Sequence, residues 1–202
     1  MGNMLTATIS VRGTRPLFWH RFGPDALPLE KQERTGVAGN DPEEWKKTVL
    51  KTAEGQLYLE PTYAFGCIRD GAKHTKKGRG SIQSLVSATL QIADDRLLVD
   101  RFLPANLYPE LINAVDEPVY LDVRGVRNPA TKARNVRYRV AASPGWVCSF
   151  SILWDSTIVS RGEMQAALID AGRLVGLGDG RSIGFGRFIV ESFDIHDDKK
   201  SA

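Results

Sequence analysis

A glycine-rich turn near the C-terminus constrains the fold of this chain more than any other feature. Residues 176–188 read GLGDGRSIGFGRF and crowd five glycines and two arginines into one short segment. Glycine adopts positive φ at little cost and lets the backbone approach a partner closely. Arg181 and Arg187 supply two cations to the same turn, which favours an anion such as a phosphodiester backbone as the partner. The alternative is a tight connector in which the glycines serve only the chain reversal.

The flanking segments predict a helix before this turn and a strand after it. Apolar residues recur at helical spacing over residues 160–175, and Ser160 and Glu163 have the spacing of a capping box. Residues 185–195 alternate loosely between apolar and polar, as in a strand. Dinucleotide-binding and P-loop motifs place their glycines after a strand and before a helix. The order here is the reverse, so those two classes of nucleotide site are excluded.

The turn resembles the C-terminal glycine-rich loop of the RAMP superfamily, through the pattern Gly-x-Gly-x-x-Arg-Ser-x-Gly-Phe-Gly. The residues that carry the pattern are Gly176, Gly178, Arg181, Ser182, Gly184, Phe185 and Gly186. That superfamily supplies RNA-binding backbone subunits and guide-processing ribonucleases of CRISPR effector complexes. The resemblance implies an α+β fold with a ferredoxin-like, RRM-type βαββαβ core, an antiparallel sheet and this loop between the last helix and the last strand. We therefore expect the whole turn, Gly180 and Arg187 included, to bind nucleic acid.

The rest of the chain fits that architecture. Alternating residues predict strands at 6–13, 119–126, 135–142 and 146–155, and a proline-led helix is predicted over 61–74. The expected order is strand, helix, strands, helix, strand.

Length and composition favour one domain. The chain has 202 residues, 42% of them hydrophobic, which suits a single core. We expect one nucleic-acid-binding domain over 1–196 and a tail over 197–202. Within the domain, residues 14–55 predict an irregular insertion in which Asp41 and Pro42 open a short helix.

Positive charge is concentrated in two further segments, although the net charge is only +3. One segment follows the helix predicted over 61–74 and contains Lys73, His74, Lys76, Lys77 and Arg79. The other is a predicted hairpin over 119–142, which contains Arg124, Arg127, Lys132, Arg134, Arg137 and Arg139 and has no acid between the first and last of these. Both segments are predicted to extend a phosphate-binding surface. The alternatives are a solvated loop for the first and the solvated face of a strand pair for the second.

The most distinctive residues of the irregular insertion are Trp19, His20, Arg21 and Phe22. In one interpretation the two aromatic rings stack on bases, and His20 and Arg21 contact the nucleic-acid backbone. The other interpretation is an apolar plug that covers the sheet.

The function predicted from these features is non-catalytic binding of single-stranded nucleic acid, RNA or DNA, with guide RNA implied by the resemblance. The resemblance also implies a repeating backbone subunit that forms a head-to-tail homo-oligomer and contacts other effector subunits. One alternative is a metal-independent guide-RNA-processing endoribonuclease with His20 as general acid or base. Another is a single-strand-binding protein of a phage or mobile element.

The remaining features indicate an intracellular protein that needs no metal or cofactor. The chain has three histidines and two distant cysteines, Cys67 and Cys148, without the spacing of zinc ligands, and the cysteines are expected to be buried thiols. The sequence contains no apolar run of membrane-spanning length and no N-terminal export signal, so we expect a cytoplasmic location and no membrane contact.

Overall fold

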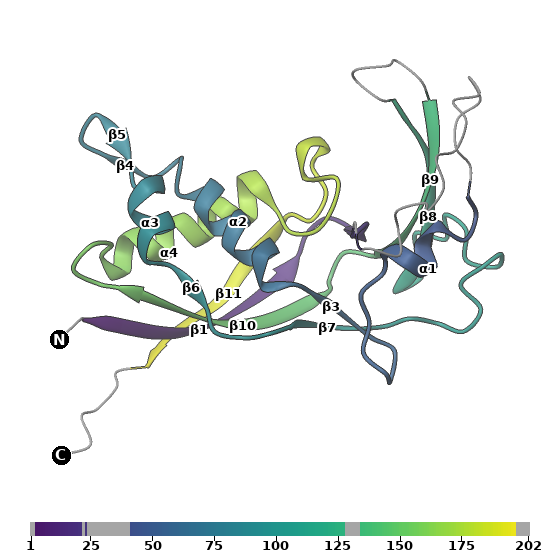
Figure 1. Ribbon diagram of the computed structural model, residues 1–202, viewed down its shortest axis with the longest axis horizontal. Coiled ribbons are helices and arrows are strands. Elements are labelled where there is room, and N and C mark those ends of the chain that lie inside the picture. The colour runs from purple at the N-terminus through teal and green to yellow at the C-terminus, as the bar shows by residue number, and fades with distance from the viewer. Residues whose placement is uncertain (1–2, 22, 24–40, 128–133, 197–202) are drawn as a thin grey trace.

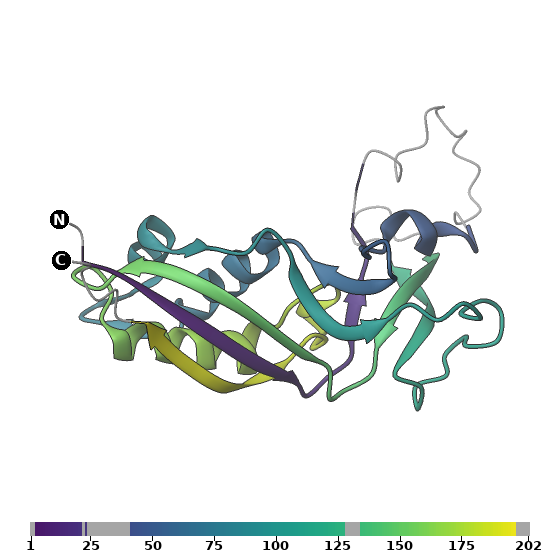
Figure 2. The same ribbon diagram turned by 90° about the horizontal axis from the view of Figure 1, so that it is seen from below.

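The computed structural model describes residues 3–21, 23, 41–127 and 134–196. Its centre is a sheet with antiparallel neighbours and helices packed on one face, seen from the side in Figure 1 and from below in Figure 2. The strand order along this sheet is β11-β1-β10-β7-β3. The strands are β1 (Met4–Gly13), β3 (Gln56–Leu59), β7 (Leu97–Phe102), β10 (Val147–Asp155) and β11 (Phe188–His196).

The order of elements along the chain makes this a ferredoxin-like α+β fold. One β-α-β unit consists of β1, α2 (Pro61–Gly71) and β7, and the second consists of β10, α4 (Arg161–Asp170) and β11. Each unit is split by a strand of the other, because β10 lies between β1 and β7, and β1 lies between β10 and β11. The predicted fold class is confirmed, with the glycine-rich turn between α4 and β11.

A second sheet, absent from the predicted core, stands beside the first. It has the order β2-β9-β8, with β2 (Leu17–Trp19), β8 (Val119–Arg127) and β9 (Arg134–Ala142). The strands predicted at 119–126 and 135–142 therefore exist, but they form an antiparallel hairpin in this second sheet and not two strands of the central one. Figure 1 shows this hairpin standing away from the central sheet.

With the hairpin in the second sheet, one strand of the predicted four-stranded core remains to be assigned. Residues that were not predicted to form a strand supply it. Two short strands, β6 (Gln91–Ile92) and β7, both pair with β10, at Ile92 with Ile152 and at Val99 with Cys148. The break between them contains two adjacent aspartates, and Asp94 accepts a hydrogen bond from the Ser151 backbone N–H at 2.5 Å. Because these charges interrupt the apolar pattern, the segment did not resemble a strand.

The helices agree with most of the sequence predictions. The capping box of α4 is confirmed, since Ser160 Oγ accepts from the Glu163 N–H at 3.3 Å and the Glu163 carboxylate accepts from the Ser160 N–H at 2.8 Å. The last turn of this helix is a π-helical segment, η2 (Ala171–Val175). The helix expected to open at Asp41 begins later, as α1 (Glu44–Thr48), after a turn in which Asp41 Oδ1 accepts from the Glu43 N–H.

Three short elements complete the described structure. Helix α3 (Gln83–Thr89) follows a short hairpin whose strands, β4 (Lys76–Lys77) and β5 (Gly80–Ser81), have two residues each. That hairpin projects from the C-terminal end of α2, at the opposite end of this helix from the glycine-rich turn (Figure 1).

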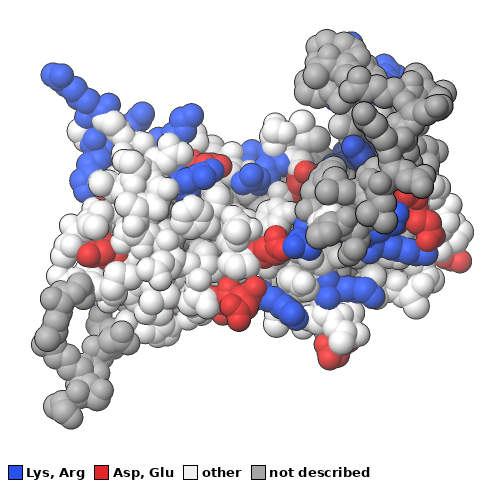
Figure 3. Space-filling view, in the orientation of Figure 1, with Lys and Arg blue, Asp and Glu red and all other residues white. Residues whose placement is uncertain are grey.

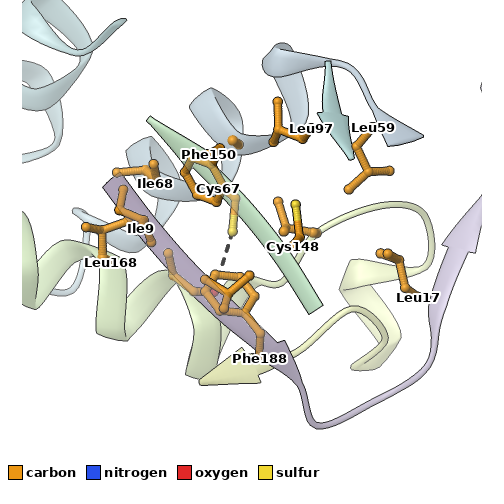
Figure 4. Close-up of a cluster of buried hydrophobic side chains, with 14 of the residues drawn as sticks. Ile9, Leu17, Leu59, Cys67, Ile68, Leu97, Cys148, Phe150, Leu168 and Phe188 are labelled. Carbon is orange, nitrogen blue, oxygen red and sulfur yellow. Dashed lines mark hydrogen bonds between the residues drawn. The ribbon is translucent and has the colours of Figure 1, made fainter. Parts of the chain in front are cut away.

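The core lies between the central sheet and the helices. Alternate residues of β1, namely Ala7, Ile9 and Val11, are fully buried and face α2 and α4. Figure 4 shows Ile68 of α2 and Leu168 of α4 on the helical side of this cluster. The opposite face of the sheet is uncovered in Figure 2. Burial of one face of each strand explains the alternating pattern that predicted β1 and β10.

The contact between α2 and the end of α4 is close enough to require glycine. A Cβ at Gly71 would lie 2.5 Å from the Ala167 carbonyl oxygen and 2.6 Å from the Ala171 nitrogen. Backbone atoms of this kind cannot move aside without displacing a helix.

We therefore expect Gly71→Ala to lower the free energy of unfolding by about 1–3 kcal/mol, because it overpacks a helix contact. The matched control is Gly162→Ala in α4, where no described atom lies within 4 Å of the new Cβ. This control is expected to change stability by less than about 1 kcal/mol, in the stabilising direction. Urea denaturation of both variants measures the difference, and equal stabilities would contradict the packing argument.

Candidate nucleic-acid interface

The glycine-rich turn is a closed loop pinned to β2. At its base the Leu177 N–H donates to the Gly186 carbonyl at 2.9 Å. On its inner side the Asp179 N–H donates to the Phe18 carbonyl at 2.9 Å and the Gly186 N–H donates to the Pro16 carbonyl at 2.8 Å. The tip is a short 3-10 turn over Arg181–Ile183. The loop is therefore a defined structure that presents its tip outward.

All five glycines of the loop have positive φ, but they do not serve the same purpose. A Cβ at Gly186 would lie 1.8 Å from the Leu177 oxygen, and one at Gly178 would lie 2.6 Å from the Phe18 oxygen. Gly176 and Gly180 are similarly crowded, at 2.7 and 2.9 Å from their nearest described neighbours. Gly184 differs, because no described atom lies within 4 Å of its Cβ position. The connector interpretation thus accounts for all five glycines, four by positive φ together with close packing and Gly184 by positive φ alone, and the half-buried Gly184 has open space at its Cβ position.

A buried ion network joins this loop to the second sheet. Arg139 of β9, with a side chain 5% exposed, donates to Asp179 of the loop at 2.8 Å and to Asp122 of β8 at 3.0 Å. Asp122 is 1% exposed and also accepts from Arg124 at 2.8 Å. The charges are therefore mutually compensated, and the network fixes the loop relative to β8 and β9.

Aromatic side chains fill the space around that network. The rings of Phe18 and Phe185 lie 4.2 Å apart, and the Arg124 guanidinium lies 4.8 Å from the Phe185 ring centroid. Phe185 is therefore partly buried and supports the loop, and Arg124, 39% exposed, is held by Asp122 and these rings. Contact of either residue with nucleic acid stays a prediction.

Trp19 is likewise part of the core. Its side chain is 2% exposed and its indole N–H donates to the Tyr58 carbonyl at 2.7 Å. Stacking on a base would require Trp19 to leave this position, so the expected stacking role is wrong and the apolar-plug interpretation holds for this residue. Phe22, its expected companion, lies outside the described residues.

A cleft of about 620 Å³ separates the glycine-rich turn from α2. Its walls come from α2, from η2 and from the turn, and its lining consists of Tyr63, Asp70, Leu174, Val175, residues 178–182 and Arg187. The sequence analysis predicted the residues of the turn. It did not place the wall formed by α2, although a helix predicted over 61–74 that carries a polar face offers a signal for it.

The charges of this cleft leave two arginines without carboxylate partners. Asp179 is neutralised by Arg139, and Asp70 is paired with Arg69 at 2.9 Å. Arg181 and Arg187 form no ion pair with the described part of the chain, and Arg187 Nη1 is buried without a hydrogen-bond partner there. The other terminal nitrogen of Arg187 donates to the Arg181 carbonyl at 3.4 Å. Buried guanidinium donors without a partner favour a bound anion.

Tyr63 of the cleft and Cys67 behind it both have raised pKa values. Burial, followed by the nearby Glu60 and Asp179 charges, raises the pKa of Tyr63, so its hydroxyl stays protonated and can donate. Burial raises the pKa of the Cys67 thiol to about 12, although Arg181 and Arg187 act in the opposite direction. Cys67 is fully buried behind the cleft and therefore does not supply a thiolate.

His20 lies in a separate ion cluster. Its Nε2 is 3.0 Å from Glu44 Oε1, and Glu44 also accepts from the Arg137 guanidinium and from the Tyr138 N–H. Burial by itself raises the pKa of Glu44, but the bonds from His20 and Tyr138 and the charge of Arg137 outweigh it, and the net direction is down. Arg137 is therefore paired with Glu44 and its side chain is 32% exposed, so its contact with a phosphate stays a prediction. Arg21, the neighbour of His20, pairs with Glu60 at 2.7 Å.

The remaining basic residues lie away from the cleft. Lys73 and His74 are exposed at the end of α2, and Lys76, Lys77 and Arg79 are exposed on the adjoining β4–β5 hairpin, where Lys77 pairs with Glu163 at 3.0 Å. Arg127 and Arg134 face each other across the β8–β9 hairpin and are exposed, and Lys132 lies outside the described residues. Figure 3 shows blue side chains along the upper edge of the molecule, from the β4–β5 hairpin toward the middle.

The described residues contain no group of three or more His, Cys, Asp or Glu side chains that could hold a metal ion. None of their helices has the length and apolar character needed to cross a membrane.

Comparison with known proteins supports the fold. No protein-family model and no curated protein matches the chain. A chain in the cryo-EM structure of the Type III-B Cmr-beta complex bound to cognate target RNA is similar in structure, with a TM-score of 0.50 and 11% sequence identity. The similarity covers 96% of this chain and 61% of the other, so this chain spans about three fifths of its neighbour's length. The chain thus shares its fold with that chain of the Type III-B Cmr-beta structure.

The ion network predicts that Arg139 is essential for stability. Replacing Arg139 by Leu leaves buried Asp122 with Arg124 as its one arginine partner and releases Asp179, so we expect the free energy of unfolding to fall by about 3 kcal/mol or more. Arg127→Leu, at the exposed end of the same hairpin, is the matched control and is expected to change it by less than about 0.5 kcal/mol. Urea denaturation monitored by tryptophan fluorescence distinguishes the two, and an Arg139 variant as stable as the control would disprove the structural role.

Proposed function

We propose that this protein binds single-stranded RNA, without cleaving it, through the cleft between α2 and the glycine-rich turn. The observation that carries this proposal is the pair of arginines, Arg181 and Arg187, that line the cleft without carboxylate partners in the described structure. Gly178 and Gly180 line the same cleft, and a backbone without side chains allows close approach of a phosphodiester. Every acid of the cleft is already paired, so the site is positive despite the small net charge of the chain.

The shared fold is consistent with a role in a CRISPR-type ribonucleoprotein. The neighbouring chain belongs to a complex that was determined bound to cognate target RNA. The glycine-rich turn, which resembles that of the RAMP superfamily, occupies the expected place between α4 and β11. We therefore assign the chain a role like that of the superfamily's backbone subunits, with a guide RNA as the bound strand.

The surroundings of His20 do not favour the ribonuclease alternative. Its ring is bonded to Glu44, its side chain is only 11% exposed, and it is not among the residues that line the cleft. A general acid or base must reach the reacting oxygen, and a transition state with added negative charge needs a cation beside it. The two unpaired arginines lie at the cleft, where binding alone is the function that they support.

The first prediction concerns the affinity for RNA and its dependence on salt concentration. Removing both cleft arginines in Arg181→Ala/Arg187→Ala should weaken RNA binding by about 10–100-fold and lower the slope of log K against log salt by about 1.4, because two phosphate contacts are lost. Fluorescence anisotropy with unrelated RNA oligomers at several salt concentrations measures both quantities.

The matched control is Arg12→Ala/Arg96→Ala, which removes the same charge from β1 and from the segment before β7. Arg12 pairs with Glu191 and Arg96 lies over Tyr58, so neither belongs to the cleft. This variant should bind almost as the wild type does. Equal affinities of the two double variants would show that the cleft is not the binding site.

The second consequence concerns assembly. A backbone subunit repeats along its strand by a heterologous contact, which generates an open filament unless the rotation closes. Mass photometry with RNAs of increasing length should therefore show a stepwise rise in the number of bound copies. A protein that remains a monomer on a strand of about forty nucleotides would contradict the backbone assignment, while leaving RNA binding itself intact.

A further inference from the structure

The middle of α2 contains a glycine that the fold does not require. Glycine is the poorest helix former after proline, so a glycine inside a helix usually has a packing reason. Gly71, at the end of the same helix, has one, because a Cβ there would collide with the α4 backbone at 2.5 Å. Gly66 has none, since no described atom lies within 4 Å of its Cβ position and its φ is that of an ordinary helix.

Gly66 lies on the solvent side of α2, beside the proposed RNA site. It lines a second hollow of about 360 Å³ together with Arg21, Glu60, Thr62, Tyr63 and Arg181. Tyr63 and Arg181 also line the main cleft, so the two hollows adjoin at these residues. A side chain at position 66 would project into the second hollow, whereas glycine leaves the helix backbone bare.

The same face of α2 leads on to the basic hairpin. Within α2, Thr62, Gly66 and Arg69 recur at helical spacing and lie one above the other. The distance from Thr62 to Arg69 is about 10 Å at the rise of an α-helix, and Lys73 follows in the turn after the helix ends at Gly71. Beyond Lys73 the chain continues into exposed Lys76 and Arg79 of the β4–β5 hairpin, so cations stand at both ends of this helix face.

We propose that the bound RNA strand leaves the cleft over Gly66 and follows the exposed face of α2 toward the β4–β5 hairpin. This inference rests on the proposed function and adds the path of the strand. The occupant is the phosphodiester backbone of a single strand, because Arg181 on one side and Lys73 on the other form no ion pair with the described residues. The missing side chain at Gly66 allows the strand to cross the helix in contact with its backbone.

The test replaces Gly66 by Gln, a good helix former without charge. Gly66→Gln should keep or raise the melting temperature and weaken RNA binding by about tenfold or more, because its side chain occupies the path of the strand. Gly66→Ala, which adds only a methyl group, should raise the melting temperature with a smaller loss of affinity. The control Gly162→Gln, at an equally open helical position in α4, should leave affinity unchanged.

We expect Gly66→Gln to preserve or raise stability while it weakens RNA binding. If Gly66 had a purely structural role, the substitution would lower stability and binding together. If Gly66→Gln binds RNA as tightly as the wild type while the Arg181/Arg187 double variant binds weakly, the inference is overturned and the proposed function stands. The bare helix face then belongs to another occupant, such as a partner subunit. If the double-arginine variant also binds like the wild type, the proposed function fails and the inference fails with it.

Discussion

The contact on which the proposed interface depends is the buried ion network centred on Arg139. One guanidinium holds two carboxylates from different parts of the chain, Asp122 of β8 and Asp179 of the glycine-rich turn. Arg139 and Asp122 are almost fully removed from water, at 5% and 1% exposed, so each is tolerated only while its partners stay in place, whereas Asp179 is 37% exposed. The network therefore couples the position of the turn to the second sheet. It also neutralises Asp179 at the edge of the cleft, which leaves the charge of Arg181 and Arg187 uncompensated there.

The two faces of the central sheet have different chemistry, and this bears on where a strand of RNA can lie. RRM domains bind bases on aromatic residues of the open sheet face. Here the outward residues of the two central strands include five hydroxyl side chains, Thr6, Thr8 and Ser10 of β1 and Ser149 and Ser151 of β10, together with Arg12, Val147 and Leu153, and none of these is aromatic. That face lacks a stacking platform on its central strands. The unpaired arginines lie instead on the helical side, at the turn that joins η2 to β11.

The sequence predicted well those features that depend on local patterns. One buried face for each strand produces strict alternation, which identified β1 and β10, and the capping residues Ser160 and Glu163 identified the start of α4. The strand split into β6 and β7 escaped prediction, because its aspartates interrupt the apolar pattern to bond the neighbouring strand. The hairpin of β8 and β9 was predicted, but pairing between distant strands decides which sheet it joins, and no local signal encodes that choice.

The candidate site was likewise predicted only in part. The arginines and glycines of the turn were visible as a motif, and the structure places them at a cleft. The role of Trp19 was misjudged, because sequence alone does not distinguish an exposed ring from one that is packed in the core. Phe185, Arg124 and Arg137 stay predicted contacts, although each is partly buried against other side chains. Gly66 was not identified from the sequence, because the open space beside it is apparent only in the folded structure.

The most direct measurement of the central claim is ultraviolet cross-linking of bound single-stranded RNA, followed by mass spectrometry of the cross-linked peptides. The account predicts cross-links in the glycine-rich turn, over residues 176–188, and in α2, over residues 61–73. Cross-links confined to the open sheet face, on β1 and β10, or to the β8–β9 hairpin would place the strand elsewhere and contradict the account.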